Sequence, residues 1–418
     1  MGDRRLPQPW IERGVFSGYG HGRSLPTHPP GISSRQSMKV NEYAITSPFS
    51  VPFIHRLRFT ENAFSPGNPV LDEVLRDGSA EPPFAVAFFD KAVSEAWPDL
   101  EESAWEYARE RRWRPLQTVM IPGGEESKNS PAVLERILQI IHDSGIDRQS
   151  YVMVVGGGAV LDAVGYAAAI AHRGVRLVRL PTTTLSQADS GVGVKNGVNA
   201  FGKKNYLGVF SPPWAVVNDQ SLLSTLSDRD WRCGFAEAVK VGLVKNAALF
   251  EDIEAQAGRI SERHLDAALP VIRKSAEMHL RHITESGDPF ELTSARPLDF
   301  GHWAAHKLEQ MTQFRLRHGE AVAIGLALDT AYSAETGLLA ESDSERVLDC
   351  LDGLGFRLYD EAIADTQVLL RGLDEFREHL GGELTVAMIN GIGVPTDIHE
   401  IQPAAVRTSA ERLASRHR

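Results

Sequence analysis

Short apolar runs and amphipathic stretches alternate through the first half of the chain. Runs such as "FAVAFFD", "YVMVVGGG" and "VRLVRLPTT" are separated by helical patterns such as "VLERILQIIHDSG" and "AVLDAVGYAAAIAHRG". Strands that alternate with helices at this spacing form a parallel sheet with helices on both faces. The pattern therefore predicts an α/β domain with a parallel sheet over residues 41–218.

The pattern changes after about Asp219. Long amphipathic stretches such as "GFAEAVKVGLVKNAALFEDIEAQA" and "AALPVIRKSAEMHLRHITE" follow, with one late extended run, "ELTVAMI". They predict a mainly α-helical domain over residues 219–418. A cleft between two such domains is a favoured place for a ligand, so we expect the active site there.

Composition narrows the class of protein. Residues 1–40 are rich in Pro, Gly, Ser and Arg without periodicity, and we predict a poorly ordered extension. The net charge of -11 argues against a nucleic-acid or anionic-membrane partner. Only two cysteines occur, which argues against a disulfide framework and a cysteine-rich zinc site. We read no membrane span and no signal peptide, and expect a cytoplasmic protein.

Two Gly-rich segments carry candidate binding chemistry. In "VMVVGGGAVLDAVG" a strand enters three glycines and then a helix, which lets the backbone approach a pyrophosphate. The usual G-x-G-x-x-G is absent, so this is a Rossmann-like variant or simply a tight turn. The polar loop region in "RLPTTTLSQADSGVGVKNGVNAFGKKNYLG" places lysines among glycines and asparagines, which suits an anionic substrate or else a solvated surface loop.

Three histidines form the third candidate. His302 and His306 are four residues apart on an expected helix, and His318 opens a second one. A catalytic zinc site takes three nitrogen or oxygen ligands and an open position, and Glu237 is a candidate carboxylate. Each histidine alone could equally be an ordinary core or surface residue.

The order of these motifs resembles the 3-dehydroquinate synthase superfamily, also called the sugar phosphate cyclases. The motifs are GGG-x3-D, HRG, PTT, D-x5-K, GKKN, AE-x2-K, GH-x3-H and HGEAVAIG, and they run from about Glu125 to His318. The resemblance implies a metal, Zn2+ or Co2+, held by Glu237, His302 and His318. It implies NAD held by Glu125, Lys128, Gly156, Gly157, Gly158, Asp162, Thr182 and Thr183.

The resemblance also implies a substrate pocket and a reaction. The pocket residues would be Asp189, Lys195, Lys204, Asn205 and Lys240, with His306 and Arg173 on the phosphate and Arg173 coming from the neighbouring subunit of a homodimer. A hydroxyl would be oxidised transiently by NAD, phosphate would leave by β-elimination, and the ketone would be reduced again. Ring opening and an intramolecular aldol reaction would close a carbocycle, with lysines stabilising the negative charge.

The chain departs from true dehydroquinate synthases just before the first metal histidine. They carry an arginine and then an asparagine shortly before GH, whereas this chain has "TSARPLDFGH". Ala295 falls where the arginine would be, Arg296 is displaced by one, and Asp299 replaces the asparagine. His379 falls near a phosphate-contacting lysine of the family. A carboxylate would repel a substrate carboxylate. We therefore expect the branch that cyclises sedoheptulose 7-phosphate to 2-epi-5-epi-valiolone or 2-epi-valiolone.

Other activities stay open at this point. A 3-dehydroquinate synthase is the first alternative. A metal-dependent polyol dehydrogenase shares the architecture but needs no lysine-rich "KNGVNAFGKKN" segment. A non-catalytic NAD-binding regulator would not need Glu237, His302, His318 and Lys195.

Overall fold

This computed structural model describes residues 47, 49, 51–77, 81–286, 288–290, 297–380 and 384–417, with the side chains of 374, 376 and 378–380 excepted. Residues Phe53–Arg418 form one compact unit. The extension predicted for residues 1–40 and the candidate Arg296 lie outside the described residues, as does the side chain of His379.

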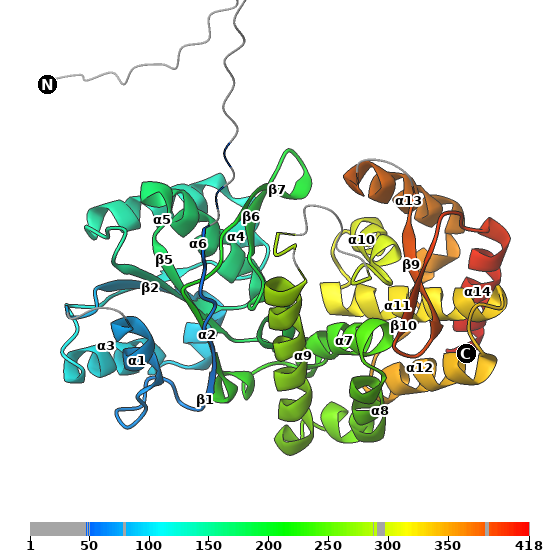
Figure 1. Cartoon of the computed structure of the whole chain (residues 1–418), viewed down its shortest axis with the longest axis horizontal. Helices are drawn as coiled ribbons and strands as arrows, with labels where there is room; N and C mark the ends of the chain where they lie inside the picture. The colour runs from blue at the N-terminus through cyan, green and yellow to red at the C-terminus, as the bar shows by residue number, and fades with distance from the viewer. Residues whose placement is uncertain are drawn as a thin grey trace, which may run out of the picture. The chain divides into compact units, whose positions relative to one another are not determined.

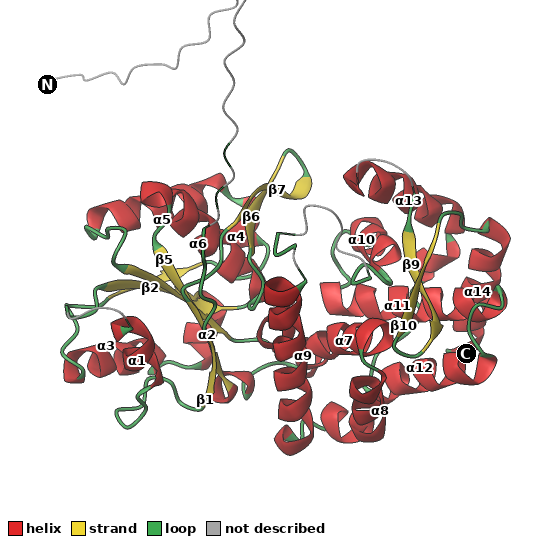
Figure 2. Cartoon of the chain, viewed as in Figure 1, coloured by secondary structure: helices red, strands yellow, loops and turns green. Residues whose placement is uncertain are grey.

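The first half is built on a six-stranded sheet of order β1-β8-β5-β4-β2-β3, in which all paired strands are parallel (Figure 2). Every residue of β2 and β4 is buried, as expected of strands covered on both faces. The strands are β1 (Leu57–Thr60), β2 (Ala85–Asp90), β3 (Gln117–Ile121), β4 (Tyr151–Gly156), β5 (Arg176–Pro181) and β8 (Ala215–Asp219).

Helices cover both faces of this sheet. Apolar side chains of α1 and α3 pack on one face and those of α5 and α6 on the other (Figure 1). The helices of this half are α1 (Val70–Arg76), α2 (Lys91–Ala96), α3 (Leu100–Glu110), α4 (Glu126–Asn129), α5 (Pro131–Asp143) and α6 (Gly158–Ile170), with short turns η1 (Ala171–Arg173) and η2 (Ser186–Ser190). The Rossmann-like parallel sheet expected from the sequence is confirmed.

The rest of the chain is mainly helical, as predicted. Its core surrounds α7 and α11, which are buried along most of their length. The helices are α7 (Asp228–Lys245), α8 (Ala247–Ser261), α9 (Leu265–Glu285), α10 (His302–Met311), α11 (His318–Glu335), α12 (Glu341–Gly353), α13 (Thr366–Leu380) and α14 (Pro403–Arg416), with turns η3 (Gln220–Leu223) and η4 (Glu361–Ala364).

Two hairpins lie outside the large sheet. The polar segment read as a loop region forms an antiparallel hairpin instead, from β6 (Lys195–Ala200) and β7 (Lys203–Phe210). Its turn residues Phe201 and Gly202 have φ of 53° and 73°, the backbone that a tight two-residue hairpin turn requires. The late extended run forms β9 (Val386–Gly391), which pairs with β10 (Val394–Ile398).

The predicted boundary at residues 218 and 219 stays a prediction, although β8 ends at Asp219 and α7 begins at Asp228. Among the described residues, no helix is both long enough and apolar enough to cross a bilayer.

Candidate active site

A carboxylate and two imidazoles from three helices meet in the helical half. Glu237 lies on α7, and His302 and His318 are the first residues of α10 and α11. Glu237 Oε1 is 3.4 Å from His302 Nε2 and 3.1 Å from His318 Nε2. The three side chains can offer donor atoms that all lie within 4.8 Å of one another. This is the ligand type and number of a catalytic zinc site.

Glycines bring these helices together. A Cβ at Gly319 would lie 2.4 Å from the carbonyl oxygen of Cys233, so α11 can begin against α7 only because this residue has no side chain. A Cβ at Gly325 would lie 2.1 Å from the carbonyl oxygen of Gly301, just before α10. The close helix contacts hold His302 and His318 beside Glu237.

Lys240 lies one helical turn after Glu237 on α7. Its Nζ is 2.5 Å from Glu237 Oε2, and both side chains are buried. Burial alone would lower the pKa of Lys240, but the charges of Glu237 and Asp189 outweigh it and raise that pKa. Burial alone would raise the pKa of Glu237, but Lys240 and His302 hold it well below its ordinary value. Both groups are therefore charged at neutral pH in the metal-free protein.

His306 lies beside the other two histidines. Its ring centroid is 5.5 Å from that of His302 and 6.1 Å from that of His318. The side chain of His306 is exposed to solvent, but desolvation by the surrounding protein atoms and the charges of His302 and His318 lower its pKa to about 3, so its ring is neutral. His306, Glu309 and His318 form a second set with donor atoms within 4.8 Å. The geometry thus offers two overlapping sets that share His318.

Glu309 was not anticipated from the sequence. Its carboxylate accepts a hydrogen bond from Lys204 Nζ at 2.8 Å and lies 3.4 Å from His318 Nδ1. Burial would raise the pKa of Glu309, but the hydrogen bond from His318 and the charges of His318 and Lys204 lower it to about 2. The spacing of residues 302, 306 and 309 on one helix, i, i+4 and i+7, is the signal that could have found it.

His279 was also missed. It lies on α9, and its Nδ1 is 2.5 Å from Asp189 Oδ1 in the turn η2. Burial would raise the pKa of Asp189, but His279 outweighs it and lowers that pKa. Asp189 also contributes to the charge around Lys240, so this pair borders the cluster. Nothing in the sequence connects the two residues, because they come from distant segments.

The residues assigned to NAD gather at the carboxyl ends of β4 and β5. Gly156, Gly157 and Gly158 join β4 to α6, and the amide of Thr182 donates to the carbonyl of Gly156 at 3.0 Å. A Cβ at Gly157 would lie 3.3 Å from Thr183 Cγ2, so the turn and the threonine loop are in contact.

Polar side chains connect this turn with the hairpin. Lys128 Nζ is 2.7 Å from Asp162 Oδ2 and also donates to Asn205 Oδ1. Glu125 Oε2 accepts from Asn199 Nδ2 at 3.0 Å. Lys204 lies on the same hairpin, so the structure joins residues assigned to the cofactor with residues assigned to the substrate.

Three further candidates lie in different settings. Lys195 begins β6 and is exposed. Arg173, in the turn after α6, is exposed and forms no hydrogen bond or ion pair with any described residue. Asp299 precedes α10, and its Oδ2 is buried without a hydrogen-bond partner among the described residues. Burial lowers the pKa of Lys240, and the charges of Glu237 and Asp189 raise it. The negative charge of Asp299 adds a smaller contribution in the same direction as those two carboxylates.

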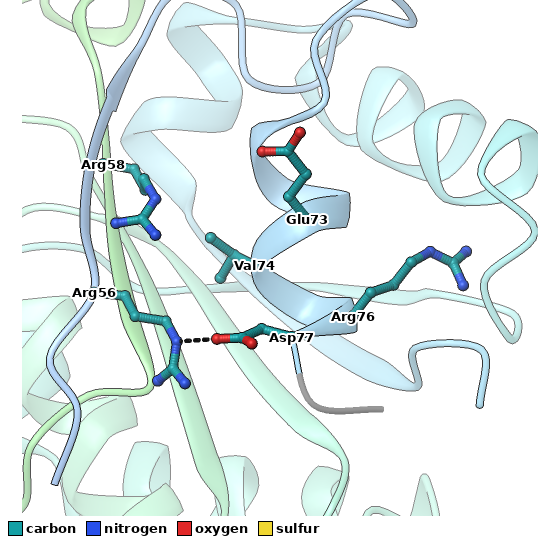
Figure 3. A pocket seen from close by; sticks show the side chains of 6 residues that line it. All are labelled: Arg56, Arg58, Glu73, Val74, Arg76 and Asp77. Carbon is teal, nitrogen blue, oxygen red and sulfur yellow. Dashed lines mark hydrogen bonds and ion pairs between the residues drawn. The ribbon is translucent and has the colours of Figure 1, made fainter. Parts of the chain in front are cut away.

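A surface pocket of about 250 Å³ lies elsewhere, between β1 and α1 (Figure 3). Arg56 pairs there with Asp77 at 2.7 Å, and Arg58 and Glu73 line the opening. None of its lining residues is a candidate site residue, and the histidines and lysines gathered around Glu237 do not line it.

Comparison with known proteins gives a consistent picture. Residues 118–233 match the family described as 3-dehydroquinate synthase N-terminal, and residues 234–373 match 3-dehydroquinate synthase C-terminal. The chain is 34% identical over 365 residues to a 2-epi-5-epi-valiolone synthase of Streptomyces glaucescens, covering 86% of this chain and 91% of that protein. It is also 34% identical over 338 residues to a 3-dehydroquinate synthase of Rhodopseudomonas palustris, covering 77% and 85%.

Solved structures agree. The 2-epi-5-epi-valiolone synthase of Streptomyces hygroscopicus subsp. jinggangensis, with NAD+ and Zn2+ bound, superposes with a TM-score of 0.80 at 26% identity, over 90% of this chain and all of that one (100%). A 2-deoxy-scyllo-inosose synthase complexed with carbaglucose-6-phosphate, NAD+ and Co2+ shares the fold, with a TM-score of 0.73 at 22% identity over 85% of this chain and 96% of that one.

Proposed function

Because this chain belongs to the 3-dehydroquinate synthase superfamily of sugar phosphate cyclases, we propose that it uses NAD and a divalent metal to convert sedoheptulose 7-phosphate into a C7 cyclitol of the 2-epi-5-epi-valiolone or 2-epi-valiolone type, with release of phosphate. The observation that carries the choice of substrate is the carboxylate oxygen Oδ2 of Asp299, which is buried and has no hydrogen-bond partner in the part of the chain that the structure describes.

The donor set supports a zinc or cobalt ion. Glu237, His302 and His318 would hold it, because two imidazole nitrogens and one carboxylate oxygen lie within reach of one ion. Such an ion would act as a Lewis acid toward a substrate hydroxyl or ketone oxygen. Lys240 Nζ, beside Glu237, would then face the oxygens next to the ion and stabilise negative charge on them.

The glycine turn supports NAD. A Cβ at Gly156 would lie 3.0 Å from Val160 Cβ and 3.1 Å from Asp90 Cβ, so the strand, the turn and α6 pack closely. The 13-residue helix α6 begins at Gly158 and presents its amino end where a pyrophosphate would lie. NAD would accept a hydride from the substrate and return it, so that no net oxidation occurs.

The remaining residues would bind and orient the sugar phosphate. Lys204 lies at the hairpin side of the cleft, where its ammonium group would attract the phosphate. The neutral ring of His306 would donate one N–H to a phosphate oxygen. Asp189, held by His279, would orient a hydroxyl near Lys240.

Asp299 favours a polyol over a ketoacid. Its buried Oδ2 can accept a hydrogen bond from a substrate hydroxyl, and leaving it unpartnered is costly. The same carboxylate would repel the carboxylate of the dehydroquinate precursor. A 3-dehydroquinate synthase stays the alternative, because such enzymes are similar to this chain to the same degree.

The test offers purified protein, NAD and Zn2+ either sedoheptulose 7-phosphate or the seven-carbon ketoacid phosphate, and measures phosphate release. We expect phosphate from the sedoheptulose ester only, without accumulation of NADH. Phosphate release from the ketoacid alone would contradict sedoheptulose 7-phosphate as the substrate. Accumulation of NADH with simple polyols would indicate a dehydrogenase instead.

The proposal includes a homodimer in which Arg173 reaches the partner's site. Two observations support it. Arg173 is exposed and unpaired among the described residues. The hairpin nearby in sequence exposes apolar side chains, with Phe201 85% exposed and Tyr206 54% exposed. Exposed hairpins that carry exposed aromatic residues are typical of surfaces that become covered.

A further inference from the structure

Glu309 contacts side chains from two different elements, the helix α11 and the hairpin β6–β7. Its carboxylate is 3% exposed, and it faces His318 on α11 and Lys204 on the hairpin β6–β7. A buried carboxylate is costly unless each of its oxygens is paired with a donor. Here Oε1 is paired with the ammonium group and Oε2 with the imidazole, so both oxygens are used.

The geometry fixes which nitrogen of the His318 ring can bind a metal ion. His318 Nε2 faces Glu237 Oε1 at 3.1 Å, and Nδ1 faces Glu309 Oε2 at 3.4 Å. Because a carboxylate only accepts hydrogen bonds, Nδ1 carries a proton toward Glu309, and in the metal-free protein Nε2 carries one toward Glu237. A metal ion would displace the Nε2 proton, while the Nδ1 proton stays directed at Glu309 and keeps Nε2 directed toward Glu237 and His302. A carboxylate behind a metal-binding histidine fixes its tautomer and ring orientation and raises its basicity.

We propose that Glu309 is a positioning residue that orients His318 for the metal and holds Lys204 over the same cleft. One side chain then has two separate contacts, one that orients the imidazole of His318 and one that anchors the hairpin lysine. The inference rests on the proposed function only in its assumption that Glu237, His302 and His318 hold a metal.

A competing arrangement uses the same residues. His306, Glu309 and His318 could themselves hold a metal, because their donor atoms also lie within 4.8 Å of one another. In that arrangement Glu309 would be a ligand, and Lys204 would have to leave it. The two arrangements predict different results when Glu309 is changed to glutamine, which keeps the shape but removes the charge.

The experiment measures metal binding without substrate. Zn2+ is titrated into metal-free protein in competition with a chromophoric chelator, for the wild type, Glu309→Gln, Lys204→Met and a matched control, Glu375→Gln. Glu375 lies on α13, is exposed, and forms an ion pair with Lys307, which lies on α10 as Glu309 does. The control therefore removes a carboxylate charge beside α10 without changing a residue that contacts His318 or Lys204.

We expect Glu309→Gln to weaken zinc binding by about 10- to 100-fold, the usual effect of losing a partner behind a metal ligand. Lys204→Met and the control should bind zinc as the wild type does. The visible absorption of bound Co2+ should keep its wild-type shape in Glu309→Gln, since the ligands are the same. Wild-type zinc affinity in Glu309→Gln would overturn the proposal, and so would a changed cobalt spectrum, which would make Glu309 a ligand.

A second measurement tests the link to the hairpin. Hydrogen exchange of the β7 amides should speed up in both Glu309→Gln and Lys204→Met and stay unchanged in the control. Unchanged exchange in both variants would overturn this half of the proposal. Neither measurement uses a sugar phosphate, so a failure of the proposed reaction leaves both results interpretable.

Discussion

The carboxylate of Glu237 is almost fully buried, and it stays ionised only because charged side chains lie beside it. Lys240 Nζ lies on one oxygen, and the imidazoles of His302 and His318 lie near the other. The hydrogen bonds to Glu237 and Glu309 outweigh the effect of burial and raise the pKa of His318 to about 10. The protein without metal thus keeps a charged network that a metal ion could enter only by displacing a proton.

Substituting one histidine at a time distinguishes between the two overlapping sets of possible metal ligands. We expect His302→Ala to lose stoichiometric zinc and activity together, because it belongs only to the set with Glu237. His306→Ala should keep its zinc and raise the KM for the sugar phosphate by about 10-fold, the effect of one lost hydrogen bond to a charged group.

Metal analysis of the two dialysed variants beside the wild type checks this prediction. Equal loss of zinc in both would contradict the separation of roles, and zinc loss confined to His306→Ala would favour the second set.

How far the sequence could predict this site depends on spacing. Glu237, His302 and His318 were predicted because they stand in short, ordered motifs. The structure brings their donor atoms within 4.8 Å of one another, and their role as metal ligands stays a prediction. His279 could not be found, because its contact with Asp189 arises only when α9 packs against the turn η2. Glu309 lies between the motifs GH-x3-H and HGEAVAIG, and a lone glutamate on an amphipathic helix is usually interpreted as a solvated residue.

At the scale of elements, the packing of α10 against α11 decides where the histidines lie. Gly301 has a φ of 78°, a backbone that favours glycine, and a Cβ at Gly325 on α11 would lie 2.1 Å from its carbonyl oxygen. The carboxylate of Asp329, also on α11, accepts hydrogen bonds from the amide of Gly301 and the indole of Trp303, both at 2.9 Å. These contacts fix the start of α10 and hence His302.

We expect Gly325→Ala to separate the two helices. The new Cβ would lie 2.1 Å from the carbonyl oxygen of Gly301, and overpacking of this kind costs roughly 1–3 kcal/mol of unfolding free energy. Denaturant unfolding measures the loss, and zinc titration should show weaker binding in the same variant.

Gly258→Ala is the matched control, because nothing lies within 4 Å of a Cβ at this position of α8. It should raise the unfolding free energy by about 0.5–1 kcal/mol through helix propensity alone. A Gly325→Ala protein as stable as the wild type would show that α10 can move without cost.

Asp329 predicts a pH dependence. Burial raises its pKa to about 7, although the hydrogen bonds from Trp303 and Gly301 oppose the shift. A carboxyl whose pKa is higher in the folded state stabilises the fold below its unfolded pKa, near 4, and loses that contribution as the pH rises to about 7. The loss is at most roughly 4 kcal/mol.

The comparison that isolates this group is metal-free Asp329→Asn. The difference in unfolding free energy between wild type and variant, measured from about pH 5 to 8, should shift in favour of the variant as the pH rises. A difference that does not change with pH would mean that Asp329 is ionised throughout.

At the scale of elements, the sequence predicted the large parallel sheet but not the hairpin β6–β7. The parallel sheet followed from buried runs between helices, and β2 and β4 are buried along their full length. The hairpin β6–β7 was not predicted, because lysines, asparagines and glycines hide the alternation of a strand, and β7 is mostly exposed.

At the scale of the whole molecule, the proposed dimer can be tested by mixing two inactive proteins. Arg173→Ala keeps the metal cluster, and Glu237→Gln keeps Arg173. If Arg173 serves the partner's site, a mixed dimer contains one complete site. Random mixing should then restore about a quarter of wild-type activity, since half of the dimers are mixed and each has one good site.

The phosphate-release assay on unfolded and refolded mixtures measures this restoration. The matched control mixes Arg173→Ala with a chain that carries both substitutions, which leaves every site incomplete. No restoration in the first mixture would mean that Arg173 acts within its own chain, or not at all.

The turn that carries Arg173 has a backbone conformation that lowers the stability of the fold. His172 and Arg173 have φ of 50° and 62°, and a non-glycine residue in this region costs roughly 1–2 kcal/mol. Glycine would adopt the same backbone without that cost. A screen for survival at high temperature alone should therefore favour Arg173→Gly and return a more stable protein that lacks the arginine proposed to bind the substrate phosphate.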